Sequence, residues 1–138
     1  MPFYAWGDVA RDLEPNPSLP AGMTRQSIVG QGGMLCMHEA FPNLKCAPHR
    51  HEAEQFSLVL KGRMRFTINS EEKVLGPGEV AHIPSNVPHA IESLEEYVQV
   101  LDVFVPLRPD ILARLQAMGS LSPPPLPDTG ERAGGGGA

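Results

Sequence analysis

The stretch PHRHEAEQFSLVLKG, residues 48–62, joins two histidines and a glutamine to an apolar run. Successive side chains of a β-strand point to opposite faces, so one strand over 49–59 would put His49, His51 and Gln55 on the same face. Imidazoles at alternate positions of a strand can hold a divalent ion together. The stretch therefore predicts a metal-binding strand, and the alternative is a pair of surface histidines near a loop.

The chain on both sides of this stretch predicts an all-β domain. Prolines and glycines interrupt short runs of Val, Ile, Leu, Phe and Met at even intervals, which is typical of an antiparallel sandwich or barrel. One helix is expected over 109–119, because Pro109 suits its start, Gly119 suits its end and an apolar stripe lies between them.

A second polar stretch, GPGEVAHIPSNVPHAI at 76–91, predicts a strand, a tight turn and another strand. Asn86 tolerates the left-handed backbone that such a turn often requires. His89 would begin the next strand, where its side chain can point inward toward the first two histidines.

These two stretches, taken in order, resemble the two motifs of the cupin family. The first motif is matched by His49, His51, Gln55 and Gly62. The second motif is matched by Gly78, Pro84 and His89, with Asn86 in place of a glycine and Ser93 in place of an asparagine. The resemblance implies a double-stranded β-helix (jelly-roll) barrel. It also implies one divalent metal ion, bound by His49, His51, Gln55 and His89.

Gln55 occupies a position where many cupins carry a glutamate. A neutral amide and three neutral imidazoles would leave the ion with its full charge, which favours Lewis-acid chemistry and an anionic substrate such as a carboxylate. Imidazole suits Zn, Ni, Fe, Mn, Co and Cu, so the ligand set does not choose the metal. The alternative is an emptied site whose residues are kept for packing.

The last apolar run, VQVLDVFVPLRPD at 98–110, contains a carboxylate, Asp102, in its most apolar part. An unpaired carboxylate inside a barrel is unfavourable, so we expect Asp102 to be paired, protonated or close to the metal. Arg108 can reach the same opening, and a carboxylate beside a cation in a cleft is typical of acid–base chemistry. The alternative is that Asp102 faces solvent or forms a structural ion pair with Arg108 or Arg114.

The pattern Asp-x-Phe-x-x-x-Arg at 102–108 resembles the pectin-degradation cupins of the KdgF type. Those proteins bind their metal through three histidines and a glutamine and promote ring opening of 4,5-unsaturated uronates. The resemblance implies that Asp102 is a proton shuttle, Phe104 a pocket wall and Arg108 a clamp on the substrate carboxylate. His38 lies on a predicted strand that can border the pocket, so it is a further candidate contact for substrate.

Three functions are compatible with these residues. The first is a metal-dependent lyase, isomerase or ring-opening enzyme that acts on a small carboxylate or sugar acid. The second is a ferrous cupin dioxygenase, which iron dependence with oxygen uptake would identify. The third is a cupin that binds a small molecule without turnover.

The composition limits the partners. The chain has 138 residues and a net charge of −5, without a cluster of lysines or arginines, which argues against nucleic acid and anionic membrane surfaces. No apolar run approaches the roughly 20 residues of a membrane helix, and the N-terminus lacks the pattern of a secretory signal. Because Cys36 and Cys46 form no CxxC motif, we expect a protein of the reducing cytoplasm.

We divide the chain into three parts. Residues 1–21 form an N-terminal segment that could be exchanged between subunits, 22–118 form the barrel with its helix, and 119–138 form a disordered tail rich in proline and glycine. Small cupins commonly share N-terminal strands, and the even positions of 56–60 give a strand an apolar second face. A homodimer is therefore expected.

Overall fold

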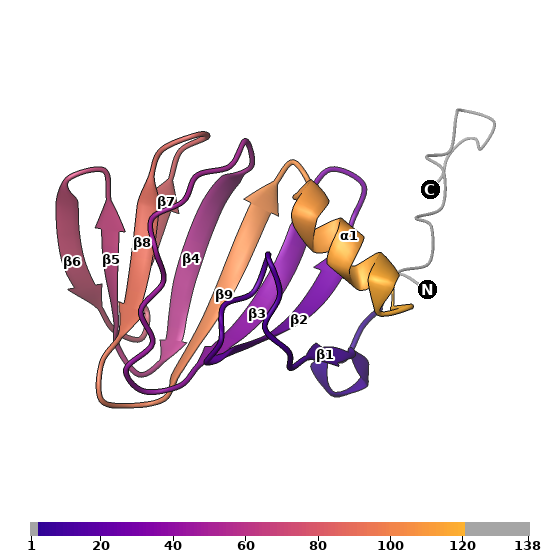
Figure 1. Cartoon of the computed structure of the whole chain (residues 1–138), viewed down its shortest axis with the longest axis horizontal. Helices are drawn as coiled ribbons and strands as arrows, with labels where there is room; N and C mark the ends of the chain where they lie inside the picture. Colours follow the sequence, from indigo (N-terminus) through magenta and orange to yellow (C-terminus); the bar gives the residue numbers. More distant parts are fainter. Residues whose placement is uncertain (1–2, 121–138) are drawn as a thin grey trace.

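The computed structural model describes residues 3–120, which form two antiparallel β-sheets and one helix (Figure 1). The strands are β1 (Arg11–Asp12), β2 (Met23–Val29), β3 (Met34–Ala40), β4 (Glu54–Lys61), β5 (Met64–Ile68), β6 (Glu71–Leu75), β7 (Val80–Ile83), β8 (His89–Ser93) and β9 (Val98–Val105). A 3-10 turn covers Trp6–Asp8, and helix α1 covers Pro109–Ala117. The all-β prediction with one C-terminal helix is confirmed, whereas the predicted disordered tail lies outside the described residues from 121 onward.

The larger sheet has the strand order β1-β2-β3-β9-β4-β7, and the smaller one has the order β6-β5-β8. One apolar core includes Val59, Phe66 and Val98, from β4, β5 and β9. A second core lies under α1, which Figure 1 shows beside the β2–β3 end of the larger sheet. There Ile111 and Leu115 pack with residues of β3 and β9, and burial of each stabilises the fold by about 2 kcal/mol.

Strand β4 alternates as the sequence predicts, but it begins later than expected. Gln55 is buried, while Phe56 on the other face is 38% exposed. His49 and His51 precede the strand and lie in a loop, so the prediction of one strand over 49–59 is wrong. The reason is long-range: His49 exchanges two backbone hydrogen bonds with His89, and the carbonyl of His51 accepts one from Asn86.

Two tight backbone positions lie where the motifs predict them. Asn86 has φ of 62°, as expected for the turn between β7 and β8. Gly62 has φ of 73°, and a Cβ atom there would collide with the carbonyl oxygen of Tyr97. Because the colliding atom belongs to the backbone, a side chain at position 62 would require the β4–β5 turn to move.

The N-terminal segment packs against its own barrel. Strand β1 pairs with β2, and Asp12 receives two hydrogen bonds from Arg114 of α1, at 2.8 and 3.0 Å. Arg25 of β2 is 1% exposed, donates to the backbone and side-chain oxygens of Ser18 and lies 3.7 Å from Asp12. We call Asp12, Ser18, Arg25 and Arg114 the Arg25 cluster. Exchange of this segment between two chains stays a prediction.

No helix within residues 3–120 is long and apolar enough to cross a membrane.

Candidate metal centre and substrate cavity

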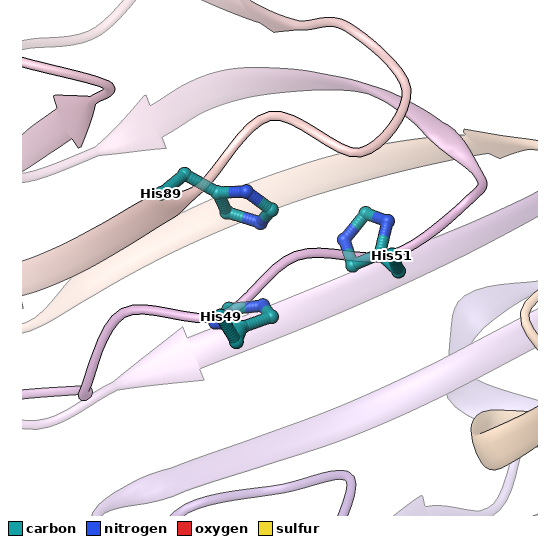
Figure 2. Close-up of side chains that lie close together, drawn as sticks. All are labelled: His49, His51 and His89. Atoms are coloured by element: carbon teal, nitrogen blue, oxygen red, sulfur yellow. The ribbon is translucent and has the colours of Figure 1, made fainter.

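Three histidines from the two sequence motifs meet at one point. His49 and His51 come from the loop before β4, and His89 is the first residue of β8. Their candidate ligand atoms all lie within 4.8 Å of one another, and Figure 2 shows the three rings around a common space. We call these residues the histidine cluster; the arrangement could hold a metal ion.

Backbone carbonyls fix which nitrogen of two of the rings faces this space. The Nδ1 atoms of His51 and His89 lie 2.8 Å from the carbonyl oxygens of Ala53 and Val87. A carbonyl oxygen only accepts hydrogen bonds, so these ring nitrogens carry the protons. In neutral rings the other nitrogens therefore carry lone pairs, as metal-ligating histidines do.

The histidine cluster contains acceptors that face no donor. Nε2 of His89 is buried and has no hydrogen-bond partner among residues 3–120. Nε2 of His51 lies 3.1 Å from Oε1 of Gln55, so two lone-pair atoms face each other. Gln55 is held in this orientation because its Nε2 donates to Oγ of Ser57. Three imidazole nitrogens and an amide oxygen, left without donors, fit a divalent cation.

The electrostatics of the cluster favour neutral imidazoles. Burial lowers the pKa of His49 and of His51, and the positive charge of Arg108 lowers both further. Burial lowers the pKa of His89 to about 4, although its hydrogen bond with Val87 acts in the opposite direction. All three rings are therefore neutral at pH 7, the form that can ligate a metal.

A cavity of about 610 Å³ opens beside the histidine cluster, and every residue predicted for the site lines it. Phe104 and Arg108 lie together in its wall, with the guanidinium carbon 5.0 Å from the ring centroid. The sequence reasoning missed a further wall formed by residues 16–20 of the N-terminal segment. The prolines and polar residues of that run gave no signal of a binding role, because their place at the opening depends on tertiary contacts such as those of the Arg25 cluster.

Asp102 is buried and paired, but not with the partners that the sequence suggested. Its Oδ2 lies 2.7 Å from Nδ1 of His38, and its Oδ1 accepts a hydrogen bond from Ser57 and a longer one of 3.4 Å from Gln55. Both alternatives are therefore wrong: Asp102 does not face solvent, and it forms no ion pair with Arg108 or Arg114. Arg108 instead pairs with Asp110, with Nη2 2.6 Å from Oδ2.

Arg114 and His82 lie outside the cavity. Arg114 is occupied by Asp12 in the Arg25 cluster. His82 is exposed on the outer face of the larger sheet, where its ring stacks on Phe56 at 4.7 Å and its Nε2 lies 2.6 Å from Glu54. It takes no part in the cavity.

A cupin-domain profile matches residues 39–104 of the chain. The pectin degradation protein KdgF of Dickeya dadantii (strain 3937) is 31% identical over 104 residues, which cover 73% of this chain and 94% of that protein. The chain belongs to the cupin superfamily. Within the superfamily it is a KdgF-like cupin.

Solved structures agree with this assignment at the level of the fold. KdgF from Halomonas sp. superimposes with a TM-score of 0.70 at 24% identity, covering 80% of this chain and 98% of that one. An RmlC-like cupin from Shewanella frigidimarina NCIMB 400 gives 0.71 at 21% identity, with coverages of 80% and 96%. The predicted double-stranded β-helix barrel is confirmed.

Proposed function

We propose that this chain is a metal-dependent cupin enzyme that opens the ring of a 4,5-unsaturated uronate, a lyase- or isomerase-type reaction of pectin breakdown. The observation that carries the proposal is the set of unpaired acceptors in the histidine cluster, located in one cavity with a buried carboxylate and an arginine. The name of the Dickeya relative, a pectin degradation protein, supports the choice of substrate class.

The residues that would hold the metal are His49, His51, Gln55 and His89. Their neutral donor set suits Zn, Ni, Fe, Mn, Co or Cu. Bound there, the ion would supply Lewis-acid polarisation of a substrate oxygen. Because no ligand carries a negative charge, the site would attract an anionic substrate.

Arg108 is the residue we assign to the substrate carboxylate. Its guanidinium rests against the ring of Phe104, and its Nε and Nη2 atoms are bound by Asp110. Asp110 is 46% exposed at its side chain, so it can turn into solvent when a substrate carboxylate takes its place. The stacking against Phe104 would keep the guanidinium plane oriented for a two-point contact during this exchange.

The test begins with metal content. Tag-free protein should contain about one divalent metal per chain by plasma mass spectrometry, and a His49→Ala/His89→Ala double variant should contain none. His82→Ala is the matched control, since this histidine lies outside the cavity. The metal-loaded protein should then remove the ultraviolet absorbance of an unsaturated uronate under nitrogen.

The outcomes separate the alternatives. Turnover that requires iron and consumes oxygen would identify the ferrous dioxygenase instead. A metal-loaded protein that binds the uronate without turnover would identify a binding cupin. No metal in either protein after reconstitution would contradict the enzyme proposal.

We also propose a homodimer formed through the outer face of the larger sheet. Phe56, Leu60, Val80 and Val105 are between 38% and 54% exposed, and they belong to three neighbouring strands of this sheet. Leu58 lies between Val80 and a leucine of β9 in the strand register, so the apolar surface is continuous. Exposed apolar surface of this kind favours a protein partner.

Sedimentation velocity tests the dimer. The wild type should sediment as a dimer, and Phe56→Glu should sediment as a monomer because it places a negative charge on the apolar face. Lys73→Glu, an exposed position on β6 of the other sheet, is the control. A monomeric wild type at micromolar concentration would refute the proposal. A cytoplasmic location stays a prediction.

A further inference from the structure

His38 and Asp102 form a buried pair on the inner face of the larger sheet. In the register of β3 and β9, Asp102 lies opposite Cys36 and His38 lies opposite Val100. The two side chains are therefore diagonal neighbours on one face, and Nδ1 of His38 reaches Oδ2 of Asp102 at 2.7 Å. Both residues line the cavity beside the histidine cluster.

The hydrogen bonds around Asp102 determine where the proton of His38 lies. The hydroxyl of Ser57 and the amide of Gln55 both donate to Oδ1, so the carboxylate acts as an acceptor on that side. Its Oδ2 then accepts from Nδ1–H of His38, and the neutral ring carries its lone pair on Nε2. No group within residues 3–120 forms a hydrogen bond with that Nε2, and it is not among the buried atoms left without a partner. It is therefore accessible from the cavity.

We infer that His38 is the residue that takes and returns the substrate proton, and that Asp102 positions it. This inference rests on the proposed ring-opening function and changes the assignment that the family resemblance implies, in which Asp102 itself moves the proton. A buried carboxylate behind an imidazole fixes the tautomer and the direction of the ring, and it stabilises the imidazolium that forms. Asp102 has three donors around it, whereas Nε2 of His38 has none.

The proton transfers balance without a further reactant. Nε2 of His38 takes the proton of the hydroxyl on the anomeric carbon, and a carbonyl forms there as the bond to the ring oxygen breaks. The electron pair of that bond stays on the ring oxygen, which becomes an enolate oxygen. The carbon of the double bond that does not carry this oxygen then takes the proton back from His38. The product is an open-chain keto acid isomeric with the substrate.

The first experiment compares metal-loaded His38→Gln with the wild type. Glutamine can still donate to Asp102, so the fold and the metal content should remain, while kcat falls about 100-fold or more, the usual effect of losing a general acid–base group. His38→Ala should regain part of its kcat when imidazole is added, because free imidazole can enter the vacated space. His82→Gln, on the outer face, should change neither quantity.

A second readout does not depend on activity. Nitrogen NMR of metal-free wild type should show that the neutral ring of His38 carries its proton on Nδ1 and its lone pair on Nε2. Asp102→Asn should convert this single tautomer into a mixture, because an amide can donate as well as accept.

Two results would overturn the inference. They are a His38→Gln variant with nearly wild-type kcat, and a His38 ring protonated at Nε2 with Nδ1 bare. A wild type that binds metal but does not open the uronate ring is a different result: it overturns the proposed function, and the role of His38 in that reaction with it.

Discussion

Two buried nitrogens lack hydrogen-bond partners within residues 3–120, and they belong to two different polar clusters. Nε of Arg25 is a donor in a cluster whose other charged groups are paired: Ser18 accepts from both terminal nitrogens, and Asp12 is held by Arg114. Nε2 of His89 is an acceptor surrounded by other acceptors. The first cluster joins groups of opposite charge, whereas the second presents acceptors to one another.

The difference separates a structural polar cluster from a binding one. In the Arg25 cluster, charges of opposite sign satisfy one another and fix the N-terminal segment against α1. In the histidine cluster, backbone carbonyls hold the rings of His51 and His89 so that their Nε2 lone pairs converge. Burial alone does not distinguish the two, because Arg25 and His89 are both at most 3% exposed. The two clusters differ in the kind of atom that is left unpaired, which is a donor in Arg25 and an acceptor in His89.

The largest loss of stability is expected when the Arg25 cluster is broken. Asp12→Asn removes the carboxylate that faces Arg25 and Arg114, and it leaves a buried arginine without a counter-charge. Loss of one partner from a buried ion pair costs about 3–5 kcal/mol, so urea unfolding at pH 7 should show a loss of that order while metal content stays at the wild-type value.

Asp110→Asn is the matched control for this variant, because it also removes an acid that pairs with an arginine but at a half-exposed position. It should change the free energy of unfolding by less than about 1 kcal/mol. Equal losses in the two variants would mean that the Arg25 cluster is no more structural than a surface pair.

A smaller loss of stability is expected when acid protonates the histidine cluster of the metal-free protein. Burial lowers the pKa of His89 from 6.5 to about 4, so between these values the unfolded chain binds the proton and the folded chain does not. The stabilisation is therefore fully present above pH 6.5 and is lost as the pH falls toward 4. After allowance for solvent screening, the loss should be about 1–2 kcal/mol.

Urea unfolding of the metal-free wild type and of His89→Gln at several pH values between 7.5 and 4.5, a range of about three units around the ordinary histidine pKa, checks this expectation. The variant should lose less stability over the range, because one titrating ring is gone. Burial raises the pKa of Asp12 but the hydrogen bonds from Arg114 outweigh it, so the net pKa lies below 3.8. The contribution of Asp12 to stability is therefore lost only at lower pH. Parallel plots of stability against pH for the wild type and His89→Gln would contradict the assignment of this loss to His89.

The sequence predicted the features that depend on neighbouring residues. The alternation of β4, the left-handed backbone at Asn86 and the helix after Pro109 all follow from local patterns. The four predicted metal ligands were named from the two motifs, and the resemblance supplied their convergence.

The features that depend on distant pairing could not be predicted. The loop that contains His49 is shaped by backbone bonds to His89, far along the chain. The pairing of His38 with Asp102 depends on the register between β3 and β9, and a shift of one residue would have placed the two side chains on opposite faces. Strand patterns name the residues of each face but leave the register open.

The contact between Asp12 and Arg114 joins residues 102 positions apart, and it has a consequence for the order of assembly during translation. The N-terminal segment leaves the ribosome first, yet its partner on α1 is among the last described residues to emerge. We expect the two sheets to pair before the wall at 16–20 is fixed, because contacts over long separations form late. A nascent chain halted after β9 would therefore hold a formed barrel with an unfinished cavity.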